Sequence, residues 1–346
     1  METVVIVEKL ILVVVVFTIS LVIAMYSTLA ERKIAGFMQD RYGPDRAGLW
    51  GILQPLCDGG KFFFKEEIIP AGAHKTLFIL GPTLAIITAC ISSAVIPWGG
   101  TLIIGGREVS LQVADINVGV LYIFGVVALG VYGIMLGGWA SNNKFSLMGA
   151  IRAASQSISY EIGMGLSIIA LLMVTGTLSM SEIVAQQSGF VNWNIWVQPL
   201  GFLIFMTCAF AECNRVPFDL PECETELIGG YHTEYSSMKL GLYMFSEYIN
   251  MFVSSALMAA LYFGGYNFPF MNELGLSHNW ITIIGVLVFF LKIFGFIFFF
   301  MWVRWTLPRF RYDQLMNLGW KMLIPLAIAN IVLTGIITVV KDMYFA

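Results

Sequence analysis

The chain has 346 residues, of which 58% are hydrophobic and 12% are charged, and its formal net charge at pH 7 is −3. Soluble domains carry about 25% charged residues, so this composition excludes a soluble domain and predicts an integral membrane protein. The sequence has no basic tail and no interleaving of aromatic with basic residues, and therefore gives no indication of nucleic-acid binding.

Eight segments have about the length and apolar composition of a membrane-spanning helix, which needs about 20 residues. They are Val5–Leu29, Leu77–Trp98, Asn117–Gly138, Ser157–Leu178, Trp196–Ala211, Leu240–Phe263, Ile281–Trp302 and Met322–Val340. The first is too long for the apolar part of a signal peptide, and the fifth is short. The sequence therefore predicts an all-α membrane protein, in which residues 1–346 form a single polytopic domain without internal repeats.

The basic residues are distributed unevenly among the seven loops, and this asymmetry predicts the orientation of the chain. The first loop contains seven of them, and the third, fifth and seventh loops contain two or more each. The second loop contains only Arg107, and the fourth and sixth loops contain none. We therefore expect the odd-numbered loops to face the cytoplasm, and both termini to lie on the outer side of the membrane.

The long first loop contains two segments of different character. Residues 49–64 mix large apolar side chains with Asp58 and Lys61, which is typical of an amphipathic helix lying in the membrane interface, although Gly59 and Gly60 interrupt it. The preceding segment, Glu31–Arg46, is rich in charged and turn-forming residues. It is either the basic flank of the first helix or a cavity mouth where Arg and Lys meet an anionic or carbonyl headgroup.

The segment Ala211–Glu226 reads A-E-C-N-R-V-P-F-D-L-P-E-C-E-T-E and contains five acidic residues but only one basic residue, Arg215. Pro217 and Pro221 lack a backbone donor and resist regular helix. We therefore expect an irregular acidic segment at the cytoplasmic membrane edge, between the fifth and sixth spans.

Charged residues within the spans are further candidates, because each costs roughly 2.5–3.5 kcal/mol at the centre of a membrane helix. Glu161 lies within a turn or two of the start of the fourth span, Glu212 ends the fifth, and Glu247 lies about two turns into the sixth. Lys292 lies near the middle of the seventh. Carboxyl groups buried close together cannot all ionise, so such a cluster would hold and pass protons.

The sequence contains no motif for hydrolysis, such as a Walker A loop, a nucleophile elbow or a metal triad. The five cysteines, at positions 57, 90, 208, 213 and 223, form no C-x-x-C motif and no metal-ligand spacing with histidine. We therefore interpret them as packing residues, and predict no metal, haem, flavin or iron–sulfur cluster in this chain.

Seven groups of motifs occur in the same order as in a known family, and together they span nearly the whole chain. They are E-R-K and Q-D-R-Y-G-P-D-R within Glu31–Arg46, D-G-G-K at Asp58–Lys61, G-W-A-S-N-N-K at Gly138–Lys144, R-A-A-S-Q and S-Y-E within Arg152–Glu161, R-V-P-F-D-L-P-E at Arg215–Glu222, G-Y-H-T-E-Y at Gly230–Tyr235 and L-P-R-F-R-Y-D at Leu307–Asp313. On these motifs the chain closely resembles the NuoH family of respiratory complex I, the proton-pumping NADH:quinone oxidoreductase. It departs from the family pattern at Cys213 and Cys223, where Ser, Thr or Ala is expected, and at Asp45, where Asn is expected.

The resemblance implies that the chain forms the access channel and part of the chamber for a quinone, either ubiquinone or menaquinone. It also implies a buried acidic proton relay that couples quinone reduction to proton pumping. The implied relay residues are Glu161, Glu212, Asp219, Glu222, Glu224, Glu226 and Glu247, and the implied quinone-channel residues are Arg32, Phe37, Arg41, Arg46, Asp58 and Lys61. FMN and iron–sulfur clusters would be held only by partners, which would be peripheral quinone-module subunits, small membrane subunits and antiporter-like subunits.

Two other functions stay open from the sequence. A membrane subunit of an energy-converting hydrogenase, or of a quinone reductase with another electron donor, would share much of this pattern, because other subunits bind the donor. A stand-alone ion-coupled transporter is disfavoured, because such proteins often have inverted repeats and helices broken at the midplane, whereas these acidic residues lie near the membrane edge.

Overall fold

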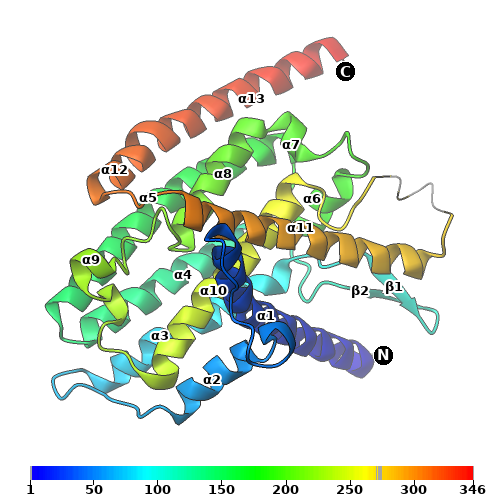
Figure 1. Ribbon diagram of the computed structural model, residues 1–346. Helices are drawn as coiled ribbons and strands as arrows, with labels where there is room; N and C mark the ends of the chain where they lie inside the picture. The colour runs from blue at the N-terminus through cyan, green and yellow to red at the C-terminus, as the bar shows by residue number, and fades with distance from the viewer. Residues whose placement is uncertain (1, 270, 272–274, 346) are drawn as a thin grey trace.

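Long helices dominate the computed structural model, which describes residues 2–269, 271 and 275–345 (Figure 1). They are α1 (Glu2–Met38), α3 (Lys75–Ser92), α4 (Gly119–Ala140), α5 (Lys144–Thr175), α10 (Ser237–Tyr262), α11 (His278–Thr306) and α13 (Ile324–Phe345). Seven stretches of the described chain are long and apolar enough to cross a membrane. The fifth predicted span corresponds to α8 (Pro199–Glu212), which is apolar but has only 14 residues. The prediction of an all-α membrane protein is confirmed.

Short elements connect these helices. They are η1 (Leu49–Gly51), α2 (Gln54–Phe64), η2 (Ser93–Val95), β1 (Thr101–Ile104), β2 (Arg107–Ser110), α6 (Met180–Gln186), α7 (Asn194–Val197), α9 (Glu224–Leu227), η3 (Gly230–His232), α12 (Tyr312–Asn317) and η4 (Leu318–Leu323). The helix expected in the first loop exists as α2, and it continues through Gly59 and Gly60. The β1–β2 hairpin was not expected from the sequence, although Gly105 and Gly106, both with positive φ, provide the two-residue turn that such a hairpin favours.

The helix α5 begins at Lys144, much earlier than the predicted start at Ser157. The side chain of Asn143 caps it by accepting a hydrogen bond from the backbone N–H of Phe145 at 2.9 Å. The first turns of α5 carry polar residues that hydropathy does not count as part of a span. Glu161 consequently lies seventeen residues after the start of α5, and its position relative to the membrane edge stays a prediction.

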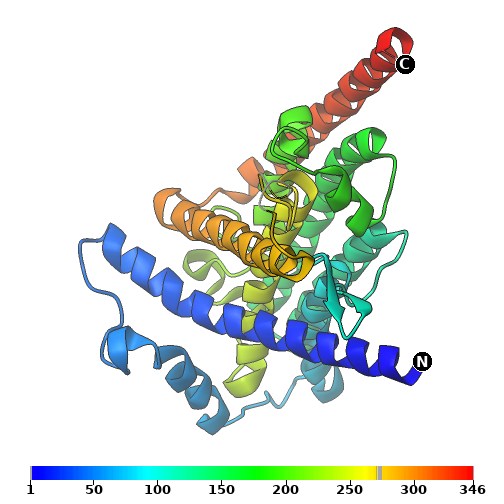
Figure 2. The ribbon, with the colours of Figure 1, turned by 90° about the vertical axis from the view of Figure 1, so that its right-hand side faces the viewer.

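The helix α10 is the centre of the bundle. It packs against α1, α3, α8 and α11, and its last eight residues, 255–262, are all buried. Around it, α3 packs on α4, α4 on α5, and α5 on both α8 and α13. Close contact of α3 with α4 requires glycine, because a Cβ on Gly133 would lie 2.8 Å from the backbone nitrogen of Ala85. Figure 2 shows α1 along one side of this bundle and α13 extending away from the other side.

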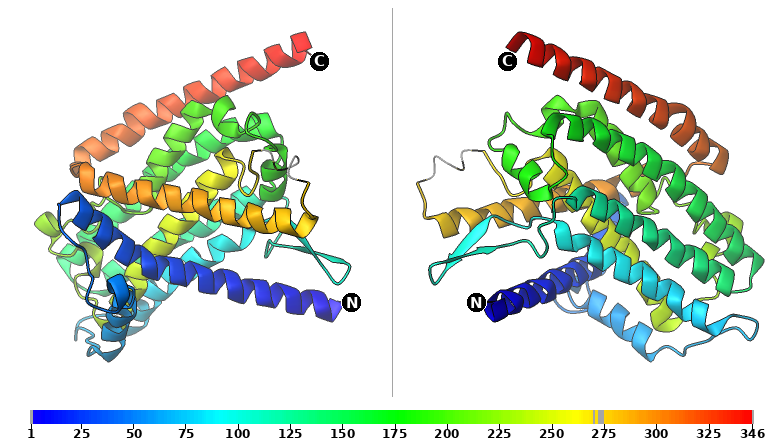
Figure 3. Two further views of the ribbon diagram at one scale, coloured as in Figure 1. Left: turned by 45° about the vertical axis from the view of Figure 1, so that its right-hand side comes forward. Right: turned by 180° about the vertical axis from the view of Figure 1, so that it is seen from behind.

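The loops meet in two groups, at opposite ends of the bundle. Loops one, three, five and seven are joined by the ion pairs Lys239–Glu67 and Arg152–Glu226 and by a hydrogen bond from Phe310 N–H to the Pro217 carbonyl. At the other end, Asn279 bonds to Ile103 of the hairpin and Asn194 bonds to the Leu261 carbonyl. The start of α1 and the end of α13 also lie at this second end (Figure 3). The odd-numbered loops therefore share one end, as their basic residues predicted.

A substitution at Gly230, in the irregular segment before α10, tests how closely this segment is packed. Its φ is +57°, and a Cβ there would lie 1.7 Å from the Pro221 carbonyl oxygen. We expect Gly230→Ala to lower the thermal unfolding midpoint of the detergent-solubilised protein by several degrees, because both strain, roughly 1–3 kcal/mol, and a backbone clash oppose it. Gly125→Ala is the matched control, since nothing lies within 4 Å of the added Cβ. Equal midpoints in the two variants would contradict the packing described.

Candidate functional site

The segment between α8 and α10 begins with a stretch that is buried although it is irregular. The sequence predicted the irregular backbone, but loops usually lie at the surface because their backbone groups need water, and here residues 213–221 are all buried. Gln156 of α5 satisfies one of these backbone groups and one at the end of α8, since its amide donates to the carbonyls of Phe218 at 2.9 Å and Ala211 at 2.8 Å. These hydrogen bonds from α5 therefore fix the segment in place, and the acidic side chains of its buried stretch are surrounded by protein rather than by water.

Four side chains form a first group of contacts in this segment. The Tyr231 hydroxyl oxygen lies within hydrogen-bond distance of two carboxyl oxygens, 3.3 Å from Glu222 Oε1 and 3.0 Å from Glu247 Oε1 of α10. His232 Nε2 lies 3.3 Å from the same Glu222 oxygen. Glu222 and Glu247, which are 25 positions apart in the sequence, thus contact the same tyrosine.

Arg215 extends this group toward α1 and α11. Its guanidinium nitrogens lie 3.9 Å from Glu247 Oε2 and 3.5 Å from Glu31 Oε2, and its Cζ lies 4.1 Å from the centre of the Tyr248 ring. Glu31 also accepts a hydrogen bond from the Tyr248 hydroxyl at 2.8 Å and pairs with Arg304. Side chains from four parts of the chain therefore neutralise one another inside the protein.

Asp219 forms a separate pair with Arg309, whose Nη2 donates to Asp219 Oδ2 at 2.7 Å. The other carboxylate oxygen, Oδ1, is buried and has no hydrogen-bond partner among the described residues. Burial and the charge of Glu222 raise the pKa of Asp219 to about 6, even though Arg309 opposes the shift. The pKa of Asp219 therefore lies closer to neutral pH than that of an ordinary aspartate.

The pKa values of the neighbouring groups move in directions that keep charges paired. Burial raises the pKa of Glu222, but hydrogen bonds from His232 and Glu247 and the His232 charge outweigh burial and lower it. Burial lowers the pKa of His232, but the hydrogen bond and charge of Glu222 outweigh it and raise the value. For Arg215, burial is outweighed by Tyr248, Glu31 and Glu247, so its pKa is raised and it stays charged.

Two small cavities continue from Glu247 into the bundle. The first, which we call the polar cavity, has a volume of about 20 Å³ and is lined by the polar side chains of Ser157, Glu212, Asn214, Ser246, Glu247 and Asn250. The second, the Glu161 cavity, has a similar volume of about 20 Å³, and Glu161, Glu212 and Asn250 are among its lining residues. Glu212 and Asn250 line both cavities. The acidic side chains therefore follow the order Glu222, Glu247, Glu212, Glu161, with Glu247 near the loop and Glu161 farthest from it.

Not every candidate acid belongs to this buried series. Glu224 and Glu226 are exposed at α9, where Glu226 pairs with Arg152 at 2.5 Å. Lys292, the partly buried base of α11, also lies elsewhere, because its ammonium donates to the carbonyls of Phe263, Gly265 and Asn267 at 2.7–2.8 Å. It caps the end of α10, where a positive charge is favourable, and so has a local structural role.

The quinone-channel candidates of the first loop are only partly brought together. Asp58 of α2 accepts hydrogen bonds from Arg32 at 2.6 Å and Lys61 at 3.4 Å, and also from Gln54 at 3.0 Å. Burial raises the pKa of Asp58, but the Gln54 hydrogen bond and the Arg32 charge outweigh it and lower the value. The other three candidates, Phe37, Arg41 and Arg46, are exposed. The structure therefore joins α1 to α2 through Asp58, and leaves the remaining candidates on an open surface.

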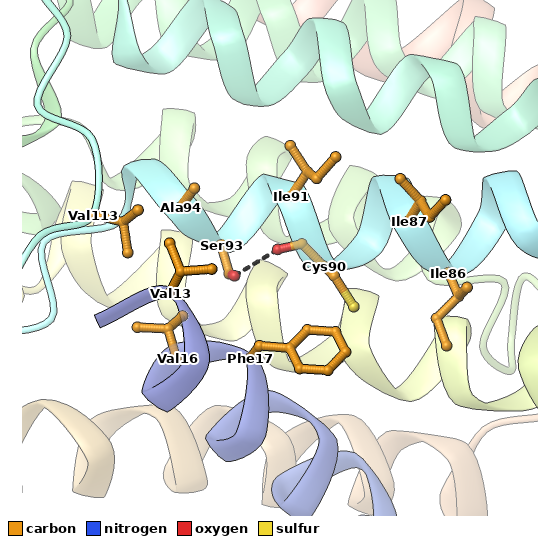
Figure 4. A pocket seen from close by; sticks show the side chains of 10 residues that line it. All are labelled: Val13, Val16, Phe17, Ile86, Ile87, Cys90, Ile91, Ser93, Ala94 and Val113. Atoms are coloured by element: carbon orange, nitrogen blue, oxygen red, sulfur yellow. Dashed lines mark hydrogen bonds between the residues drawn. The ribbon is translucent and has the colours of Figure 1, made fainter. Parts of the chain in front are cut away.

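A large apolar cavity lies between α1, α2, α3 and α10, and we call it the portal cavity. Its volume is about 610 Å³, and its lining residues are Phe17, Leu21, Val22, Met25, Pro55, Leu56, Gly59, Gly60, Phe62, Phe63, Ile86, Met238, Leu242 and Phe245. A second cavity, of about 470 Å³, continues along α1 and α3 and shares Phe17 and Ile86 with it. Figure 4 shows that its side chains are apolar apart from Cys90 and Ser93, whose hydroxyl donates to the Cys90 carbonyl at 2.6 Å. Both cavities suit a hydrocarbon chain.

Two charged residues that long helices contribute to the site were not among the candidates from sequence, and neither was Arg309, the partner of Asp219. Glu31 was read as part of a charged loop motif, and Arg304 was counted only as a basic loop residue. Both lie inside long helices, Glu31 in α1 and Arg304 in α11. Their position in the sequence could have identified them, because each lies just beyond the predicted end of a span, Leu29 or Trp302. The structure extends both helices past these predicted ends.

Known proteins match this chain over almost its full length. A model of the NADH dehydrogenase family matches residues 10–335. The chain is 72% identical over 328 residues to a NADH-quinone oxidoreductase H subunit of Cytophaga hutchinsonii, an alignment that covers 95% of this chain and 96% of that protein. It is 63% identical to the NADH-quinone oxidoreductase H subunit of Flavobacterium psychrophilum, with 97% and 98% covered. It is 60% identical to the protein of the same name from Flavobacterium johnsoniae, with 99% and 98% covered.

The His232–Glu222 pair predicts a pH dependence of stability. Because the pKa of folded His232 is raised, the pair stabilises fully below the ordinary imidazole pKa of about 6.5, and this contribution is lost as pH rises through the folded value. We expect His232→Gln to lower the thermal unfolding midpoint at about pH 6 and to have little effect at about pH 9. The control is His74→Gln at an exposed position. A destabilisation that grows with pH would contradict the pairing.

Proposed function

Because the chain belongs to the NADH dehydrogenase family, as the NuoH component of NADH-quinone oxidoreductase, we propose that it supplies that enzyme with a channel for the quinone and a buried relay for protons. The chain is a multi-pass protein of the inner membrane, and its partners are the other subunits of the complex. The chain would carry no electrons, and FMN and iron–sulfur clusters would be held by partner subunits.

The portal cavity is the proposed quinone channel. Its apolar lining fits the isoprenoid tail of a ubiquinone or menaquinone, and it lies between membrane-spanning helices and the amphipathic helix α2. On the α2 side of this cavity, Arg32 pairs with Asp58. Deeper in the bundle, Glu31 pairs with Arg215 and Arg304. A carbonyl headgroup would leave the apolar cavity and meet these charges, while its tail stays among apolar side chains.

The series of acids that share cavities is the observation that carries the proton relay. Glu222 and Glu247 share Tyr231, Glu247 and Glu212 line the polar cavity, and Glu212 and Glu161 line the next. Each cavity has room for about one water molecule, since about 10–15 Å³ is the minimum. A proton could therefore pass from carboxyl group to carboxyl group through one bridging water at each step. Exposed Glu224 and Glu226 would mark the outer limit of the relay.

Coupling between the two parts would be electrostatic. Two unit charges 4 Å apart interact by about 4 kcal/mol at an effective dielectric of 20, which corresponds to about three pKa units. A change of charge on the quinone near Asp219 and Arg215 would therefore change which neighbouring carboxyl groups hold protons. This requires the odd-numbered loops to face the cytoplasm, where the peripheral subunits would dock, and places both termini on the periplasmic side.

The relay predicts that its inner acids are needed for activity but not for folding. We expect Glu212→Gln and Glu161→Gln to assemble normally, because glutamine keeps the side-chain shape, and to reduce coupled NADH:quinone reduction at least several-fold. The rate of quinone reduction by each variant is measured in membranes and compared with its proton uptake. The control is Glu182→Gln, which changes an exposed acid of α6 at the opposite end. Unchanged reduction and pumping in both inner variants would rule out the relay.

The quinone channel predicts a steric effect at Gly60, which lines the portal cavity and has nothing within 4 Å of an added Cβ. We expect Gly60→Leu to fold normally, since leucine favours helix more than glycine does, and to narrow the cavity. The KM for a long-tailed quinone should rise several-fold, whereas the KM for a short-tailed analogue should change little. A uniform change for both substrates would argue against a tail channel at this place.

A further inference from the structure

Tyr231 occupies a special position within the buried acidic group. It belongs to the short helix η3 and is fully buried. Its ring packs edge to face against His232 and Tyr243, at centroid distances of 5.2 and 5.1 Å. These contacts fix the ring, so the hydroxyl is held in one place between Glu222 of the buried loop and Glu247 of α10.

The hydroxyl of Tyr231 contacts two acceptors although it has only one proton to donate. Its distances to Glu222 Oε1 and Glu247 Oε1 are 3.3 and 3.0 Å, and a tyrosine hydroxyl is a single donor with acceptor capacity. If both carboxylates were ionised, one of them would face the hydroxyl oxygen without a hydrogen bond. If one of the two is protonated, it can donate to the hydroxyl, and the hydroxyl can donate to the other.

The charges around Tyr231 favour the state with one shared proton. Two carboxylates that contact the same group repel each other, and in a low-dielectric site one proton between them removes most of the repulsion. The titratable and charged groups that face this pair come from three places. The loop supplies His232, Asp219, Arg215 and Cys213, α10 supplies Tyr243, and α8 supplies Glu212 across the polar cavity. His232 and Arg215 balance at most two negative charges, and Arg215 is already shared with Glu31.

We propose that the hydroxyl of Tyr231 holds Glu222 and Glu247 as one carboxyl pair that shares a single proton, and that it passes this proton between the buried loop and α10. Tyr231 is then a positioning residue for the pair and the bridge between its members. The proposal deepens the proton relay described above and rests on it for its physiological meaning.

The transfer is balanced and needs no charged tyrosine. The carboxyl O–H bond of Glu222 breaks as its proton bonds to the Tyr231 oxygen, and the original hydroxyl proton of Tyr231 bonds to Glu247. The tyrosine ends neutral, with its proton now facing Glu222. Rotation about the Cζ–O bond then returns the hydroxyl to its starting orientation, and the transferred proton stays on Glu247. Burial and both carboxylates raise the pKa of Tyr231, which is consistent with a hydroxyl that remains protonated throughout.

The test compares Tyr231→Phe with Tyr243→Phe in the whole complex reconstituted into vesicles. Both substitutions remove one hydroxyl from a buried ring, but the Tyr243 hydroxyl donates to a backbone carbonyl, that of Gly133, at 3.0 Å rather than to a carboxyl group. We expect Tyr231→Phe to lower coupled quinone reduction roughly tenfold, less than the about 100-fold that loss of a positioned proton-transfer group can cost, since both carboxyl groups remain. Tyr243→Phe should stay close to wild type.

A spectroscopic measurement separates this proposal from the relay. Infrared difference spectra recorded during a pH titration should contain a protonated-carboxyl band from the pair, and Tyr231→Phe should shift its frequency and its midpoint. Should Tyr231→Phe fail to assemble, Glu222→Gln replaces it and should abolish the band, because Glu247 then ionises beside Arg215. An unchanged band in the assembled variant overturns the carboxyl pair. A shifted band with normal activity in Glu212→Gln and Glu161→Gln keeps the pair and rejects the relay.

Discussion

The charge of Arg215 is the constraint on which the rest of the site depends. A guanidinium remains charged at any physiological pH, and a buried charge without partners is very costly. Arg215 is buried, and its partners come from other parts of the chain: Glu31 of α1, and Glu247 and the Tyr248 ring of α10. The irregular segment after α8 can stay inside the bundle because these helices bring compensating groups to it. Removing a partner would leave a buried charge, which costs far more than the pair contributes.

This arrangement places polar chemistry directly beside apolar space. The portal cavity reaches α10 through Met238, Leu242 and Phe245, and the next turn of the same helix carries Glu247. One helix therefore presents apolar side chains to the proposed quinone tail and an acid to the proposed relay. Because α10 is the most buried of the long apolar helices described, neither face can adjust by moving into lipid or water. In the proposed relay, changes of charge would then be transmitted as changes of protonation.

Sequence reasoning found the acidic segment and most of the spans because hydropathy and proline chemistry are local properties. It also grouped the odd-numbered loops correctly, since basic residues gather at one end. It misplaced the start of α5, because polar residues such as Arg152 and Gln156 belong to a helix that extends beyond its apolar part. It could not separate Glu222, which contacts Tyr231, from exposed Glu224, because their environments depend on distant helices. Glu31 and Arg304 were missed for the same reason: their partners are distant in the sequence.

The central claim is that Glu247 and Glu212 act in series on one proton path. The most direct measurement is the number of protons translocated per quinone reduced in vesicles, for Glu247→Gln, Glu212→Gln and the double variant. Groups that work as one unit show strongly non-additive effects. The account predicts that the double variant loses no more proton translocation than the worse single variant. Losses that multiply would show two independent roles and would contradict a single path.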